Sequence, residues 1–370
     1  MRVVVLGATG VFGSRAVRRL AHDPRFKLVL AGRRLPALEA LRDELGDPLI
    51  DVAKLDIGTP AFADALAALH PQLVIHAAGP FQGQDYDVAD ACIACGSHYI
   101  DLADARQFVN GITALDRRAR DAGCLIVSGA SSVPALSAAV VDTFLPRFAE
   151  LQTIEHAINP GNRTPRGDAT VAAILGYCGK PIRAWRDGRW QQVHGWMDSR
   201  WQAFRFGRRW TGACDVPDLD LFPERYRGVR TVVFRAGLEL TFLQGATWLM
   251  AWLVRFGLID NLANHAARLR RMSEWFLSFG SDVGGMVVEM RGTGTDGAPL
   301  TLRWWLDADA GDGPQVPITP LVVLARRMAD GQVAETGAMP CMGLMSLDDI
   351  VSDFKGFALK SGVEDLTVSR

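Results

Sequence analysis

Residues 1–17 read MRVVVLGATGVFGSRAV, and this stretch joins a strand pattern to a glycine-rich turn and the start of a helix. Val3–Leu6 is a short apolar run rich in β-branched side chains, which is typical of a buried strand. Glycines follow at the spacing G-x-x-G-x-x-G, at Gly7, Gly10 and Gly13. Because these glycines follow a strand and open a helix, the stretch predicts the first unit of a dinucleotide-binding fold.

The glycines of this turn have distinct physical roles. Gly7 permits a tight turn off the strand, and Gly10 lets the backbone come close to a pyrophosphate at the helix N-terminus. Gly13 lets the helix lie close to the sheet. The alternative is a tight strand-to-helix turn that holds no ligand. We expect the cofactor-binding positions of the turn to be Gly7, Thr9, Gly10, Val11, Phe12 and Gly13.

The alternation of strand and helix patterns continues through the first 145 residues. Short apolar runs alternate with segments whose apolar residues recur at helical spacing, which predicts a parallel, doubly wound α/β (Rossmann) sheet. The carboxyl ends of such strands share one edge, and ligands bind in the crevice there. The predicted strands cover residues 3–6, 27–31, 50–55, 73–79, 98–102 and 124–127.

The end of the second predicted strand bears on which nucleotide is bound. A site selective for NAD usually carries an acidic residue there, which binds the ribose 2′-hydroxyl. This strand instead ends in Arg33 and Arg34, whose guanidinium groups can bind a 2′-phosphate, so the sequence favours NADP. The alternative is a solvated arginine pair at a helix start. Asp56, after the third strand, either approaches the adenine edge or caps the next turn.

Candidate residues for chemistry follow the later strands. Asp101 and Asp104 follow the fifth strand, and one of them can serve as the proton donor if burial raises its pKa. The alternative is that both only cap the following helix. Ser131 follows the sixth strand and is a candidate for substrate binding. We expect the nicotinamide ring to be walled by Ala78, Gly79, Pro80 and Phe81.

Composition limits the remaining function classes. The 370 residues carry a formal net charge of −1, which predicts no general attraction to nucleic acid or anionic lipid. Six scattered cysteines are too few for a disulfide framework, and a strand that begins near residue 2 leaves no room for a leader, so a cytoplasmic location is expected. Cys92-x-x-Cys95 lies on an apolar helix face and predicts core packing, so no metal site is expected.

Several segments resemble one known family. They are GATGVFGSRAV, LAGRRLPALEAL, VIHAAGPFQGQDYDVADACIACGSHYIDLAD and RRARDAGCLIVSGASSVPALSAAVVD, and their order and spacing are similar to the saccharopine dehydrogenase (saccharopine reductase-like) family. The resemblance implies an NADP-dependent oxidoreductase that acts on a C–N bond next to a carbon that can become a carbonyl. It also implies a Rossmann domain, an inserted domain for substrate and dimerisation, and a tail that returns to the first domain.

These observations predict two domains. Residues 1–145, completed by 331–370, form the dinucleotide-binding domain, and residues 146–330 form an α+β domain for substrate and dimerisation. Asp187-Gly188 is a strong hairpin signal within the second domain. Its arginines either bind a substrate carboxylate or are solvated surface residues. The substrate-binding candidates there are Arg163, Arg166 and Arg227.

The tail and the tryptophans predict an assembly. Thr319 is the expected N-cap of a tail helix, and a later apolar stripe over residues 347–354 is expected to dock on the N-terminal sheet. The second domain would then expose a sheet face rich in tryptophan, which predicts a homodimer through residues 150–310. The tryptophans of that face would be Trp190, Trp196, Trp304 and Trp305.

Leu238–Ile259 is the most apolar segment, and it predicts a buried or interface helix, with contact at a membrane surface as the less favoured alternative. Taken together, the sequence predicts an NADP-dependent oxidoreductase that transfers hydride to the C=N or C=O bond of a small carboxylate-bearing substrate. One alternative is a regulator that senses NADP(H) without turnover. Another is a membrane-associated reductase that modifies lipids.

Overall fold

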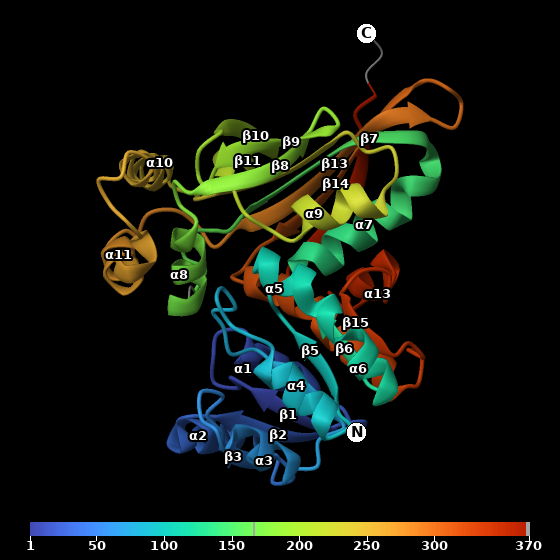
Figure 1. Ribbon diagram of the computed structural model, residues 1–370. Coiled ribbons are helices and arrows are strands. Elements are labelled where there is room, and N and C mark those ends of the chain that lie inside the picture. Colours follow the sequence, from blue (N-terminus) through green and yellow to red (C-terminus); the bar gives the residue numbers. More distant parts are fainter. Residues whose placement is uncertain (166, 368–370) are drawn as a thin grey trace. The chain divides into compact units, whose positions relative to one another are not determined.

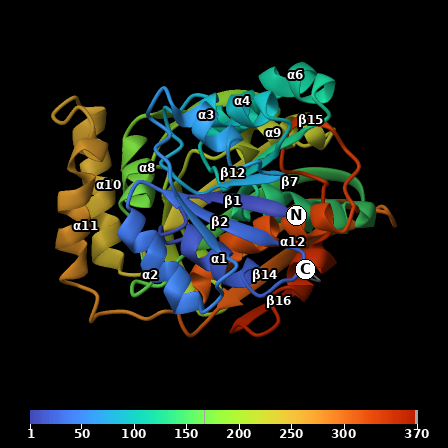
Figure 2. The same cartoon turned by 90° about the horizontal axis from the view of Figure 1, so that it is seen from below.

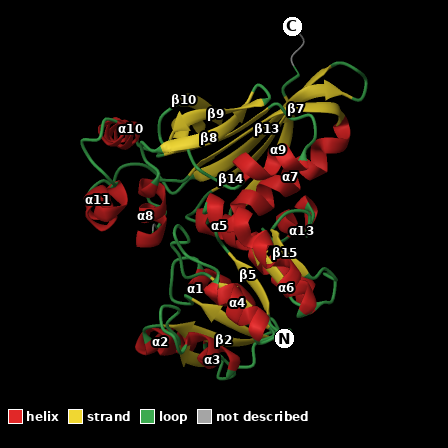
Figure 3. Ribbon diagram, viewed as in Figure 1, coloured by secondary structure: helices red, strands yellow, loops and turns green. Residues whose placement is uncertain are grey.

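The computed structural model describes residues 1–165 and 167–367, which form two compact units. The first unit comprises residues 1–136 and 315–345, and the second comprises 137–314 and the chain from 346 onward. Each unit is built around its own sheet, as the strands in Figure 3 show.

The first unit has a seven-stranded parallel sheet in the order β15-β6-β5-β4-β1-β2-β3 (Figure 1). The predicted α/β fold class is therefore confirmed. Strand β1 lies between β2 and β4, which is the point where the strand order reverses and where ligands bind in such sheets. The strands are β1 (Arg2–Leu6), β2 (Lys27–Gly32), β3 (Asp51–Lys54), β4 (Leu73–His76), β5 (His98–Asp101), β6 (Leu125–Ser128) and β15 (Gly337–Pro340).

Helices cover both faces of this sheet. A buried cluster joins one face to α3, α4 and α6, through apolar residues such as Leu66, Cys92 and Ala119. Right-handed crossovers put α1 and α2 on the opposite face, and α1 lies against α12, where Arg19 Nη1 donates to Thr319 Oγ1 at 2.8 Å. The helices are α1 (Gly13–Leu20), α2 (Leu35–Leu45), α3 (Phe62–Ala67), α4 (Asp87–Ala94), α5 (Arg106–Gly111), η1 (Ile112–Leu115), α6 (Asp116–Asp121), η2 (Ser132–Leu136) and α12 (Thr319–Ala329).

The C-terminal tail is shared between the units, which differs from the predicted boundary of 331–370. Strand β15 pairs with β6 in the first sheet, and α12, where residue 319 is the first helical residue rather than the N-cap, also belongs to the first unit. By contrast, β16 (Leu359–Asp365) pairs with β14, and α13 (Leu347–Ser352) packs against α7 in the second unit. The apolar stripe of residues 347–354 therefore packs within the second unit, against α7, and β16 then pairs with the free edge of β14. Its expected docking on the N-terminal sheet is wrong.

The second unit has a mixed sheet in the order β10-β11-β12-β7-β13-β14-β16, with the β8–β9 hairpin attached to β12. This is the predicted α+β layout. Its other strands are β7 (Phe148–Asn159), β8 (Pro181–Arg186), β9 (Arg189–His194), β10 (Arg200–Phe204), β11 (Gly207–Ala213), β12 (Thr231–Gly237), β13 (Gly284–Gly294) and β14 (Pro299–Ala308). Its other helices are α7 (Ser137–Phe144), η3 (Leu145–Arg147), α8 (Asp168–Gly176), α9 (Asp218–Arg225), α10 (Thr241–Arg255), η4 (Leu262–His265) and α11 (Ala266–Glu274), and η5 (Gly313–Ile318) leads back to the first unit.

The hairpin predicted at Asp187-Gly188 is confirmed. Both residues have positive φ angles, +52° and +73°, as the two central positions of a type I′ turn require. The antiparallel register of β8 and β9 continues from Arg186↔Arg189 to Pro181↔His194. The local turn chemistry therefore sets the register of this pair of strands.

Two of the four tryptophans expected on the dimerisation face are buried, whereas Trp190 is 40% exposed and Trp305 is half-buried. Trp196 is 1% exposed and Trp304 is 2% exposed, so neither can take part in an open face. On one side of the sheet, Phe204 of β10 packs with Ala157 and Val287. The β10–β11 hairpin thus closes over part of the surface that was expected to be open, and the homodimer stays a prediction.

A buried polar cluster joins three elements of the second unit. The Asp218 carboxylate on α9 accepts a hydrogen bond from Ser137 Oγ of α7 at 3.1 Å and lies 3.0 Å from His156 Nε2 of β7. All three side chains are buried, with at most 2% exposure. A buried polar group without a partner is costly, so Asp218 holds α7 and α9 onto the sheet.

Removing this carboxylate should destabilise the second unit. Asp218→Ala leaves the hydroxyl of Ser137 and the imidazole of His156 without their partner, so we expect a loss of roughly 3 kcal/mol in its unfolding free energy. All ten tryptophans lie between residues 185 and 305, so tryptophan fluorescence during urea denaturation reports on this unit alone. The control is Asp260→Ala, at an exposed position. An equal loss in both variants would contradict the assigned role.

Candidate functional site

The glycine-rich turn after β1 is shaped by close backbone contacts. Gly7 has a φ of +76°, and a Cβ placed on it would lie 2.9 Å from the carbonyl carbon of Ala77, after β4. A Cβ on Gly13 would lie 2.2 Å from the Gly7 carbonyl oxygen. Gly10 is exposed, and its N–H donates to that same oxygen at 2.9 Å. The turn therefore places the start of α1 directly beside the ends of β1 and β4, as the roles expected of Gly7 and Gly13 require.

The first turn of α1 is suited to an anion. It contains no acidic residue, and the positive end of its peptide dipoles is at this terminus. Val11 accepts a hydrogen bond from Arg15 Nη1 at 2.6 Å, which fixes the loop between Thr9 and Phe12. These loop residues are half-buried, so their backbone is partly accessible to a ligand.

Arg33 and Arg34 lie at the end of β2, next to the glycine turn. The Gly7 N–H donates to the Ala31 carbonyl at 3.0 Å, which holds the end of β2 against the turn. Both arginines are exposed, and neither side chain has a hydrogen bond or ion pair within the described residues. Two guanidinium groups are thus available to an anionic ligand.

The Asp56 carboxylate, after β3, accepts a hydrogen bond from the Gly58 N–H at 3.2 Å. This is the turn-capping role that was the alternative to contact with the adenine edge.

The loop after β4 is held from within. Gln84 Nε2 donates to the carbonyl oxygens of Ala78 at 3.0 Å and Pro80 at 2.7 Å. Phe81 is buried, and its ring lies 5.0 Å from that of His76, centroid to centroid. Of the four expected ring-wall residues, Phe81 therefore packs into the core, whereas the exposed positions of the loop are Gly79 and Pro80.

A chain of buried polar groups crosses the carboxyl ends of β4 and β5. The hydroxyl of Tyr99 donates to Asp101 Oδ2 at 2.9 Å, and it lies 3.0 Å from His76 Nδ1. All three side chains are at most 1% exposed. The Tyr99 hydroxyl therefore links the imidazole of His76 to the carboxyl group of Asp101. Sequence reasoning overlooked His76 and Tyr99, although a histidine in an apolar strand is a recognisable signal.

Asp101 ties together the loops that follow β5 and β6. Its Oδ1 accepts from Gly129 N–H at 2.7 Å and from Ala103 N–H at 2.9 Å, while Oδ2 accepts from Tyr99. The carboxylate does not cap the following helix, because the N-cap of α5 is Ala105 and no side chain caps it, so the helix-capping alternative is wrong for this residue. Asp104 differs, because it is exposed and its Oδ1 lies 3.4 Å from Gln82 Nε2. Of the two acid candidates, Asp104 is the one in contact with solution.

Burial shifts two pKa values in opposite directions. Burial raises the pKa of Asp101 from 3.8 to about 6, although its hydrogen bonds partly counter this. Burial also lowers the pKa of His76 from 6.5 to about 4. In both cases the uncharged form is favoured by a low-dielectric surrounding.

The candidate substrate-binding residues do not form one cluster. Ser131 is buried in the loop after β6. Arg163 follows the carboxyl end of β7 and Arg227 precedes the amino end of β12, and both are exposed. Since β7 and β12 are parallel neighbours, these arginines lie at opposite ends of the second sheet and cannot clamp the same carboxylate. Arg166 lies outside the described residues.

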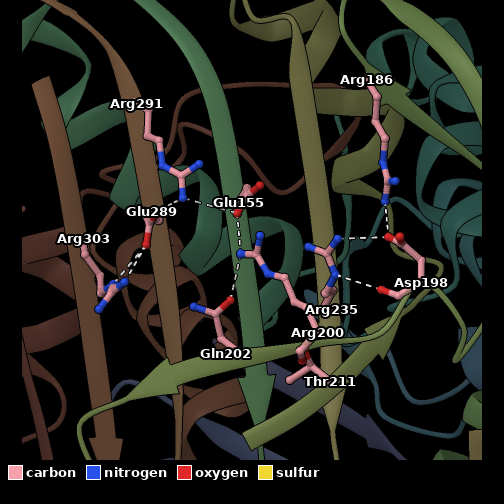
Figure 4. Close-up of polar contacts among 10 residues, drawn as sticks. All are labelled: Glu155, Arg186, Asp198, Arg200, Gln202, Thr211, Arg235, Glu289, Arg291 and Arg303. Carbon is pink, nitrogen blue, oxygen red and sulfur yellow. Dashed lines mark hydrogen bonds and ion pairs between the residues drawn. The ribbon is translucent and has the colours of Figure 1, made fainter. Parts of the chain in front are cut away.

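A charged face on the second sheet was missed by sequence reasoning (Figure 4). Glu289 of β13 lies between Arg303, at 2.8 Å, and Arg291, and Arg291 also reaches Glu155 of β7 at 3.7 Å. Although burial alone raises it, the pKa of Glu289 lies below its usual value because Arg303 and Arg291 stabilise the carboxylate. The remaining members are Arg186, Asp198, Arg200 and Arg235.

This face carries an excess of positive charge. Five arginines share three carboxylates within the group, and Arg235 is itself nearly buried. An arginine-rich surface of this kind suits recognition of a carboxylate or phosphate. Its sequence signal is the alternate spacing of Glu289 and Arg291 along one strand, which places both on one face.

The described residues contain neither a metal-binding cluster nor a membrane-spanning helix. Within residues 1–165 and 167–367, no group of three or more His, Cys, Asp or Glu side chains is placed to hold a metal ion. Cys92 is fully buried in the core, as its packing interpretation requires. No helix in that part of the chain combines the length and apolarity needed to cross a membrane.

The two buried groups should give opposite pH dependence. Folded Asp101 binds its proton more tightly than the unfolded chain, so its stabilising contribution is present below about pH 4 and lost as pH rises through about 6. The contribution of neutral His76 is present above about pH 6.5 and lost as pH falls through about 4. Asp101→Asn should therefore steepen the loss of stability on acidification, and His76→Gln should make stability fall as pH rises.

Amide hydrogen exchange of β5 and β6 peptides, corrected for intrinsic rates, measures this. The control is Asp121→Asn, which replaces a carboxylate whose side chain is 74% exposed. Identical pH slopes in the wild type and both variants would rule out the proposed titrations.

Comparison with known proteins bears on the first unit and on the fold. Residues 3–127 match the family described as Saccharopine dehydrogenase NADP binding domain. A trans-acting enoyl reductase from Mycobacterium ulcerans is 32% identical over 138 residues, which is 36% of this chain and 33% of that protein. The matched region thus spans about a third of the length of that relative.

Two solved structures share the fold along the chain. Saccharopine dehydrogenase (L-Glu forming) from Saccharomyces cerevisiae has a TM-score of 0.71 at 13% identity and covers 98% of this chain and 99% of its own. A homospermidine synthase from Legionella pneumophila, solved in complex with NAD, has a TM-score of 0.62 at 10% identity, covering 100% and 92%. The chain therefore shares the fold of these two structures, and residues 3–127 are similar to the NADP-binding domain of the saccharopine dehydrogenase family.

Proposed function

We propose that the protein is an NADP-dependent oxidoreductase. The observation that carries this proposal is the pair of exposed arginines, Arg33 and Arg34, which lie unpaired beside the glycine turn of a domain that matches an NADP-binding family. In this proposal the arginines bind the 2′-phosphate, which an acidic residue at the same position would repel. The close contacts of Gly7 and Gly13 support the same assignment, because a side chain at either position would close the turn.

For the reaction, we propose hydride transfer to a polarised double bond of a carboxylate-bearing substrate, either C=N or C=O. Bound NADPH supplies the hydride. The electron pair of the double bond then moves to the nitrogen or oxygen, which must hold or receive a proton. Asp104, exposed after β5, is the carboxylate placed to exchange that proton with solution. Asp101 positions the loops after β5 and β6 around it.

A second candidate reaction is the reduction of an enoyl group. It is favoured by the name of the mycobacterial relative, a trans-acting enoyl reductase, whose similarity lies within about a third of its length. In that reaction the hydride adds to the carbon β to a carbonyl, and the α carbon then receives a proton. The same nucleotide site serves both reactions, so the substrate distinguishes them.

Cofactor preference tests the nucleotide assignment. We expect NADPH to bind at least about tenfold more tightly than NADH, or roughly 1.4 kcal/mol, and Arg33→Asp to erode or reverse that difference. Isothermal titration calorimetry measures both affinities. Arg117→Asp is the matched control, since the side chain of Arg117 is 94% exposed on α6. Equal affinities of the wild type for NADPH and NADH would refute the assignment.

Turnover tests the reaction class. NADPH oxidation should accelerate with either aldehyde plus amino-acid pairs or a short enoyl thioester, which identifies the accepted double bond. Asp104→Asn should lower turnover by about 10²- to 10⁴-fold while leaving NADPH affinity unchanged. Near-native turnover in this variant would remove Asp104 from the mechanism. Tight NADPH binding with no turnover on any substrate would favour the regulator over the enzyme.

A further inference from the structure

The segment from residue 241 to 280, called here the helical insert, exposes an unusual amount of apolar side chain. It contains α10, η4, α11 and the turns that follow. Eight of the twelve large hydrophobic residues that are exposed in the described chain lie in it. Leu258 and Trp275 are each 71% exposed. The eight are Phe242, Leu249, Phe256, Leu258, Met272, Trp275, Leu277 and Phe279.

The burial pattern of these helices is the reverse of an ordinary surface helix. In α10 the buried residues are Gln244, Thr247 and Ala251, whereas the large apolar side chains are exposed or half-buried. In α11 only Ala266 is buried. A surface helix normally turns its apolar stripe toward the core. The helical insert therefore presents its apolar side chains outward.

These side chains gather in one part of the second unit. Helices α10 and α11 lie at the same edge of that unit (Figures 1 and 2). The ring of Phe242, at the start of α10, contacts that of Phe276, after α11, with centroids 5.1 Å apart. The two apolar helices are thus connected at one end. Exposed large apolar side chains concentrated in one segment in this way are typical of an interaction site.

Positive charge accompanies the apolar surface. Arg255, Arg268 and Arg271 are exposed, and none of them has an acidic partner within the described residues. Arg255 lies over the ring of Trp252, with its guanidinium carbon 5.1 Å from the ring centroid. Arg270 differs, since it pairs with Asp168 and Glu274. Three arginines are therefore free to meet an anionic partner.

Charge and length favour a lipid surface over a second copy of the chain. A two-fold contact through the helical insert would bring together two copies of the same net positive charge, because the insert has four arginines and only two acidic residues, Asp260 and Glu274. An anionic bilayer instead offers phosphates to the arginines and acyl chains to tryptophan, phenylalanine and leucine. The 15 residues of α10 rise about 22 Å. This is shorter than the roughly 30 Å of a hydrocarbon core, so the helix suits a position along the surface.

We propose that the helical insert docks the protein onto a membrane surface that contains anionic phospholipid. Leu258, Trp275 and Phe279 enter the boundary between headgroups and acyl chains, while Arg255, Arg268 and Arg271 bind lipid phosphates. The sequence pattern disfavours membrane contact for Leu238–Ile259 because Glu239, Gln244 and Arg255 interrupt its apolar run. The apolar surface continues beyond that residue, through α11 and the turns after it. This proposal is independent of the proposed reaction.

Vesicle co-sedimentation of the full chain tests the proposal. The probes are vesicles of phosphatidylcholine alone and vesicles that also contain about one third phosphatidylglycerol. The wild type should bind the anionic vesicles at least tenfold more tightly, and high salt should weaken that binding. Leu258→Ser with Trp275→Ser should reduce binding to both vesicles by at least tenfold. Arg268→Gln with Arg271→Gln should remove the preference for the anionic vesicles.

Two controls distinguish docking through the helical insert from non-specific adsorption and from self-association. Leu49→Ser removes a side chain that is 79% exposed in the first unit, and it should leave vesicle binding unchanged. Light scattering of the same proteins reports on self-association. A wild type that stays in the supernatant with both vesicles would overturn the proposal, as would variants that bind like the wild type. A wild-type dimer that Leu258→Ser with Trp275→Ser converts to a monomer would assign the surface to self-association instead.

Discussion

The close backbone contact at the glycine turn is the constraint on which the first unit depends. The start of α1 lies against the Gly7 carbonyl, and Gly7 itself lies against the chain that leaves β4. No side chain fits between these segments. The contact therefore sets the distance between the first helix and the centre of the sheet, and it keeps the exposed Gly10 and the arginines after β2 on the same edge. The nucleotide chemistry proposed above needs that common edge.

Much of the first unit was predictable because its signals are local. The valines of β1, the glycine spacing and the arginines after β2 each act within a few residues of one another. The burial of Asp101 was not predictable, since it depends on how β4, β5 and β6 pair and on the amide of Gly129, which is 28 residues away. Asp101 is the last residue of β5 and is buried between paired strands, whereas Asp104 lies in the loop after β5 and is exposed.

In the second unit, the positions of the candidate residues depend on which distant strands pair, and local sequence patterns do not reveal that pairing. The hairpin turn at Asp187 was predictable from its own residues. The separation of Arg163 from Arg227 was not, because it results from the parallel pairing of β7 with β12. Strand β16, which follows α13, pairs with β14 because the edge of β14 is free. The residues of β16 do not by themselves indicate which strand it pairs with. The charged face likewise appears only when β7, β13 and β14 lie side by side.

The position of β15 has a consequence for how the chain acquires its structure during synthesis. Strand β6 ends at Ser128, yet its outer neighbour β15 begins at Gly337, so about two hundred residues are made between them. Throughout that interval β6 is an open edge, with unpaired N–H and C=O groups that invite wrong pairing. Residues 137–314 of the second unit can fold meanwhile, although its edge strand β16 is made only after β15. The nucleotide-binding sheet is therefore started first and completed late, after most of its partner unit has left the ribosome.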